Sequence, residues 1–178
     1  MSRKIEADKM EVARRQINSS IKFLFNNEDP IPIHTIISAG LRILRDIAKH
    51  KNISYEGLID QVIKPHLRKQ FWSSINTTAN FFKHADKDPD GVLGGVDEEL
   101  NDALILISIT YYEYLNKDIS SEMKAFKVWF MMSNPHFFPD DINDLIENFG
   151  LKNFTLMSRE EKLNKGQDVI QASKNLRN

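Results

Sequence analysis

Apolar residues recur at spacings of three and four along most of this chain, and this period constrains the fold more than any other feature. In the first segment the stripe consists of Met10, Ala13, Ile17, Ile21 and Leu24. On an α-helix, with about 3.6 residues per turn, these side chains share one face. No segment shows a convincing alternation of apolar and polar residues of the kind that predicts a strand. The sequence therefore predicts an all-α fold.

Capping residues and prolines divide this pattern into separate helices. Asp97 and Ser120 are typical N-caps, because each carries a side-chain oxygen just before an apolar segment. Ser158 and Glu161 form a capping box that opens a C-terminal helix. In chain order, helices are predicted at 5–25, after Pro30, at 54–62, from 64 to 84, at 98–116, at 121–133, at 140–149 and after 158.

The predicted architecture is a single-domain helical bundle of about six to eight helices. Residues 1–135 form the bundle domain, and residues 136–178 form a C-terminal helical extension. The extension is expected to pack weakly, because its apolar residues Leu163, Val169 and Ile170 are too sparse for a strong stripe.

Two further features bear on packing. The helix at 98–116 is apolar on several faces, so we expect it at the centre of the fold. Gly40 lies inside a helix, where it destabilises by about 1 kcal/mol relative to alanine, so another helix is expected to approach closely there. An aromatic cluster serves either as core or as a partner surface; it comprises Phe126, Trp129, Phe130, Phe137 and Phe138.

Composition excludes several classes of function. The 24 Lys and Arg residues nearly balance the 25 Asp and Glu residues, so DNA binding through bulk charge is not expected, although a local patch for RNA stays open. The chain has no cysteine, which excludes disulfides and thiolate metal sites. The longest apolar run, 103–109, is much shorter than the about 20 residues that span a membrane. We therefore expect a cytoplasmic protein that does not enter a membrane.

Aspartates alternate in the segment after His84. Asp86, Asp88 and Asp90 occupy every second position, and Asp97 closes a span of twelve residues. A hard divalent cation takes about six to eight oxygen ligands, which alternating carboxylates in a tight turn can supply. The segment resembles the EF-hand loop, and the resemblance implies a Ca²⁺ site made by these four aspartates.

The same segment departs from the EF-hand pattern at two positions. Pro89 stands where the family carries residues with positive φ, and a proline ring holds φ near about −65°. Asp97 replaces the usual closing glutamate and has a shorter reach. Asp, Pro and Gly are also the residues of ordinary turns, so a plain connection between helices is the alternative interpretation.

Asn80 and His84 lie four residues apart, so they share one helix face. With the amphipathic first helix and the second helix rich in small residues, the sequence ANFFKH resembles the motif of HEPN domains. These are compact helical bundles whose motif is an arginine, then an asparagine or aspartate, and a histidine four residues later; in that family the histidine and the arginine act on RNA at a dimer interface. Here Ala79 replaces the arginine, which removes the cation that would stabilise charge on the reacting phosphate.

A second match to the same motif, with all of its residue types, lies at Arg45, Asp46 and His50. It stands at the end of the second helix rather than in a late helix. The resemblance implies a metal-independent ribonuclease that uses Arg45 and His50. The alternative is a solvated helix end, where basic residues favour the negative pole of the helix dipole.

The leading functional prediction is a non-enzymatic, HEPN-like helical protein that needs no cofactor. It would act through a protein partner or RNA, as a homo-oligomer. The segment with NFFKHAD also resembles a family of small bacterial helical proteins, which implies a bacterial setting and no activity. A Ca²⁺-binding protein and a ribonuclease remain the two alternatives.

Overall fold

The computed structural model describes residues 4–53, 66, 68–86, 88–95, 97–135 and 152–175. These residues contain seven α-helices and no strand, which confirms the all-α prediction. The helices predicted at 54–62 and 140–149 lie outside the described residues. In chain order the helices are α1 (Lys9–Phe25), α2 (Pro30–His50), α4 (Arg68–Phe81), α5 (Glu98–Asn116), α6 (Ser121–Ser133), α8 (Lys152–Leu156) and α9 (Arg159–Asn175).

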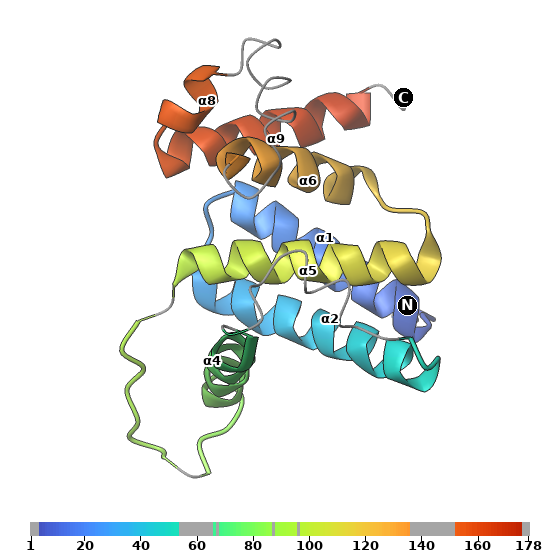
Figure 1. Ribbon diagram of the computed structural model, residues 1–178, viewed down its shortest axis with the longest axis vertical. Coiled ribbons are helices and arrows are strands. Elements are labelled where there is room, and N and C mark those ends of the chain that lie inside the picture. The colour runs from blue at the N-terminus through green and yellow to red at the C-terminus, as the bar shows by residue number, and fades with distance from the viewer. Residues whose placement is uncertain are drawn as a thin grey trace.

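Helix α5 crosses the middle of the molecule, as its apolar character predicted (Figure 1). It packs against α1, α2 and α6, with α2 and α6 on opposite sides in this view, and α9 lies beyond α6. Helix α4 lies to one side, where it contacts α2. The segment between α4 and α5 runs out from the helices in a wide loop (Figure 1). None of the described helices is long and apolar enough to cross a membrane.

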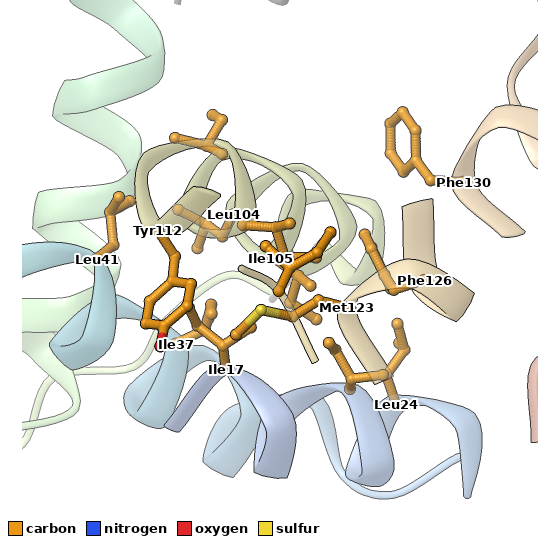
Figure 2. Close-up of a cluster of buried hydrophobic side chains, with 14 of the residues drawn as sticks. Ile17, Leu24, Ile37, Leu41, Leu104, Ile105, Tyr112, Met123, Phe126 and Phe130 are labelled. Atoms are coloured by element: carbon orange, nitrogen blue, oxygen red, sulfur yellow. The ribbon is translucent and has the colours of Figure 1, made fainter. Parts of the chain in front are cut away.

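In the part of the core that Figure 2 shows, α1, α2, α5 and α6 bring their apolar stripes together. Ile17 from α1, Ile37 from α2 and Ile105 from α5 are fully buried. Each such side chain stabilises the fold by about 1.5–3 kcal/mol relative to an exposed position. The cluster in Figure 2 also includes Leu24, Leu41, Leu104, Tyr112, Met123, Phe126 and Phe130.

The N-caps are as the sequence predicts. Asp97 accepts a hydrogen bond from the backbone N–H of Glu99 at 2.9 Å, and Ser120 accepts one from Met123 at 3.2 Å. Helix α1 starts later than its predicted start at residue 5. The reason is that Asp8 caps it, accepting from the N–H of Glu11 at 2.7 Å.

Gly40 lies where α1 and α2 approach each other closely, as predicted. A Cβ atom at this position would lie 3.3 Å from the Cβ of Gln16 and 3.8 Å from the carbonyl oxygen of Ala13. The absent side chain therefore lets the two helix backbones pack together, which compensates for the lower helix propensity of glycine.

The prediction of a weakly packed extension is wrong for α9, because this helix packs into the core. Leu163 and Ile170 are buried in the same core as α1 and α6, and Gly166 between them lies against the ring of Phe25. The indole N–H of Trp129 donates a hydrogen bond to the carbonyl oxygen of Lys162 at 2.7 Å. Counting only apolar side chains hides this stripe, because its central member is a glycine.

A buried ion pair also ties α9 to α5. The guanidinium of Arg159 donates two hydrogen bonds to the carboxylate of Asp102, at 2.8 and 3.0 Å. It also contacts Glu98 at 3.0 Å. Burial raises the pKa of Asp102 to about 6, although Arg159 opposes that shift. The carboxylate thus depends on Arg159 to remain charged inside the protein.

Candidate functional site

The end of α4 and the first residues of the following loop enclose a pocket of about 610 Å³. Asn80 and His84 both line it, as their spacing predicts, because the His84 N–H donates to the Asn80 carbonyl at 3.0 Å and extends the helical path by one turn. Two of the predicted aspartates join them. The lining residues are Thr77, Asn80, Phe81, His84, Asp86 and Asp88.

Two of these lining residues were not predicted from the sequence. Thr77 stands three residues before Asn80, and Phe81 stands three residues before His84, so helical spacing places each of them beside one of the predicted pair. That spacing is a usable signal, but threonine and phenylalanine are not typical catalytic residue types, so residue type alone does not point to them. The pocket therefore combines one aromatic ring with amide, imidazole, hydroxyl and carboxylate groups.

Within the described residues, helix α4 contacts the rest of the protein through few buried side chains. Only Ile75, Thr78 and Ala79 of the helix are buried. After the helix ends, the ring of Phe82 meets the ring of His34 edge-on, with centroids 5.7 Å apart. Asn80 and His84 themselves are exposed, so they are accessible to a ligand.

His34 joins α2 to α5 and to the end of α4 from a fully buried position. Its Nδ1 lies 2.9 Å from Oδ1 of Asn101, whose amide N–H donates to the Pro30 carbonyl at 3.0 Å. Nδ1 therefore carries the proton, and Nε2 has no hydrogen-bond partner in the described part of the chain. Burial lowers the pKa of His34, although a protonated Nε2 would gain a bond to the backbone of Ile75.

The four aspartates do not form the ligand ring that the calcium interpretation requires. Within the described residues, no three His, Asp or Glu side chains are grouped so that they could hold a metal ion. Asp97 instead caps α5, and the Gly91 N–H donates to the Asp88 carbonyl at 2.9 Å. That bond closes a turn with Pro89 at its second position, as in the alternative interpretation.

Arg45 and His50 do not converge with each other or with the pocket. Five residues on a helix differ by about 140° in direction, so these two side chains point to different sides of α2. The guanidinium carbon of Arg45 lies 4.2 Å from the ring centre of Trp72. Trp72 precedes Asn80 by eight residues, or about 12 Å along α4. Neither Arg45 nor His50 is among the residues that line the pocket.

The described members of the aromatic cluster lie in the interior. Phe126, Trp129 and Phe130 are buried and pack on one another, with the rings of Phe126 and Trp129 5.6 Å apart. These three residues are core, whereas Phe137 and Phe138 lie outside the described residues.

Comparison with known proteins adds no relative. No family model, no curated protein and no solved structure matches the chain.

Proposed function

We propose that this chain is a non-enzymatic helical protein that binds a basic segment of a protein partner at the pocket of Asn80 and His84. The observation that carries the proposal is the set of side chains in that pocket. An amide, an imidazole and two carboxylates line it, and no lysine or arginine is among its described lining residues. Such a set suits the recognition of a cation.

The same set disfavours RNA cleavage at this place. Charge that develops on a reacting phosphate needs a nearby cation, and Ala79 is a buried alanine where the HEPN motif has arginine. Arg45 stacks on Trp72, away from the pocket. Asp86 and Asp88 would repel a phosphate, because like charges at close range destabilise binding. The resemblance to HEPN domains thus supports a helical scaffold rather than a nuclease.

A lysine or arginine side chain complements the pocket in two ways. The carboxylates of Asp86 and Asp88 can accept charge-assisted hydrogen bonds from it. The ring of Phe81 offers a face for a cation–π contact worth about 0.5–2 kcal/mol. The side chains of Asn80 and His84 then supply hydrogen bonds that orient the bound segment.

The proposal is tested by fluorescence anisotropy with a labelled peptide rich in arginine and lysine. We expect the peptide to bind the wild-type protein, and a glutamate-rich peptide of equal length not to bind. The double variant Asp86→Asn/Asp88→Asn should weaken binding at least about tenfold. The matched control is Asp90→Asn, because Asp90 belongs to the same exposed loop but does not line the pocket.

A parallel assay with single-stranded RNA tests the alternative that the protein is a ribonuclease. We expect no cleavage by the wild-type protein. Cleavage that is lost in His84→Ala would overturn the non-enzymatic proposal, and cleavage lost in His50→Ala would favour the Arg45 and His50 hypothesis. Equal peptide binding by the Asp86/Asp88 double variant and the wild type would remove the pocket as the binding site.

A further inference from the structure

A second hollow lies on the opposite part of the molecule, between α6, α8 and α9. It has a volume of about 450 Å³. Its walls are chiefly apolar and include two methionines, which adapt their shape to a bound group. The side chains that form these walls are Val128, Trp129, Met132, Phe154, Met157 and Val169. We call this hollow the α6–α9 groove.

Large apolar side chains are exposed around the α6–α9 groove. Val128 and Val169 on its walls are each 49% exposed, and Leu156 on α8 is 84% exposed. Leu156 stands directly before Met157, so a protruding side chain lies beside the hollow. An apolar cluster gathered from three helices is typical of a protein-binding surface.

The edge of the groove carries both signs of charge. Lys165 and Asp168 lie along α9 at this edge, and their charged atoms are 3.7 Å apart. Both side chains are more than half exposed, so their own pairing contributes little to stability. When two copies of this edge face each other across a two-fold axis, the cation of each copy can face the anion of the other.

We propose that the α6–α9 groove binds a second copy of this chain in a two-fold arrangement. Leu156 of each copy enters the groove of the other, and Lys165 pairs with the partner's Asp168. A foreign helix would need to bring its own protruding residue and its own charges. This surface already supplies the protruding residue, the hollow and both charges, so each contact is used twice. The proposal is independent of the pocket at Asn80 and His84.

Sedimentation equilibrium across micromolar concentrations tests this proposal. The wild-type chain should form a dimer, and Leu156→Asp should raise its dissociation constant at least about tenfold, because a charge would enter an apolar groove. The matched control is Val92→Asp, since Val92 is 92% exposed in the loop after α4, away from the groove. Circular dichroism checks that both variants keep their helices, which their exposure leads us to expect.

Charge reversal tests the pairing across the two-fold axis. Lys165→Glu alone and Asp168→Lys alone should each weaken the dimer, whereas the double variant Lys165→Glu/Asp168→Lys should restore it. An equimolar mixture of the two single variants should form a mixed dimer. A monomeric wild type, a Leu156→Asp variant that still dimerises, or a double variant as weak as either single variant would overturn the proposal.

Discussion

Helices α4 and α5 are neighbours in sequence but differ in how the fold uses them. Nine of the nineteen residues of α5 are buried, whereas three of the fourteen residues of α4 are buried. Helix α5 contacts α1, α2 and α6, and α4 contacts α2 at the side of the bundle. The difference shows that α5 organises the core while α4 presents polar groups to solvent.

The polar residues of the two helices differ in the same way: those of α5 are buried and paired, and Asn80 of α4 is exposed. In α5, Asn101 bonds to His34 and the Pro30 carbonyl, and Asp102 bonds to Arg159. In α4, Asn80 is exposed and lines the pocket. Buried polar groups must be paired, because an unpaired one costs about 1–3 kcal/mol. The exposed group carries no such cost, so it is free to bind another molecule.

The largest expected effect is at the buried ion pair of α5. Arg159→Ala should lower the free energy of unfolding by about 3–5 kcal/mol, because it leaves the carboxylate of Asp102 buried without a partner. Urea denaturation measures this loss. Arg42→Ala is the control, since its pair with Asp46 is exposed and should contribute less than about 1 kcal/mol.

The same variant should show a characteristic pH dependence. The pKa of Asp102 is raised in the folded protein to about 6 from 3.8, so its contribution to stability is fully present below pH 3.8 and is lost as pH rises through about 6. Removing the guanidinium of Arg159 should extend that loss to higher pH. Equal destabilisation by Arg159→Ala at pH 5 and pH 8 would contradict a buried carboxylate.

The next largest effect on stability is expected when a buried isoleucine is shortened to alanine in each of the two helices. Ile105→Ala should cost about 2–5 kcal/mol, because Ile105 is fully buried among three other helices. Ile75→Ala in α4 should cost less, since its neighbours can relax at the side of the bundle. Urea denaturation of the two variants measures the difference, and an equal loss would remove the contrast between the helices.

A smaller effect is expected at His34, where the two regions meet. Burial lowers its pKa, so its contribution is fully present above the unfolded pKa near 6.5 and is lost as pH falls below it. Between pH 7.5 and 6 the wild type should lose up to about 1 kcal/mol from this group. His34→Gln should lack this slope, and His84→Gln should keep it.

A direct titration separates this effect from other groups. The imidazole proton signal of His34, followed by NMR, should shift at a pH below 6.5. A midpoint above that value would show that protonation stabilises the buried ring, and the expected loss of stability at low pH would be wrong.

The smallest effect on stability is expected at the pocket itself. Asn80→Ala should change the free energy of unfolding by less than about 0.5 kcal/mol, because Asn80 is exposed and its side chain supports no packing. It should nevertheless weaken binding of the basic peptide. Urea denaturation and anisotropy on one preparation measure both. A large loss of stability would show that Asn80 supports the fold, as the buried polar residues of α5 do, and would contradict its role as an exposed binding group.

Local features of this fold could be predicted from the sequence. The caps Asp97 and Ser120 act within three residues of themselves, so their chemistry is visible in the printed order. The capping box of Ser158 and Glu161 is local in the same way. The Ser158 N–H donates to the Glu161 carboxylate at 2.8 Å, and the Glu161 N–H donates to the Ser158 hydroxyl at 3.2 Å. Asn80 and His84 share a pocket because four residues make about one helical turn.

Features that join distant segments could not be predicted in this way. Arg159 and Asp102 are 57 residues apart in the sequence, and no pattern of spacing connects them. The stripe of α9 appears weak until the ring of Phe25 is seen to occupy the space that Gly166 leaves. Arg45 completes a motif in the sequence, yet the fold directs it to Trp72.

By itself, the sequence determined that this protein is helical and where most described helices begin, because hydrogen bonds and caps within a helix join residues a few positions apart. The tertiary structure alone decided that α9 belongs to the core, that the aspartates stay separate, and that Arg45 lies on Trp72 rather than beside Asn80 and His84. Those outcomes depend on which helix faces meet, and that choice is made by packing among side chains that are far apart in the chain.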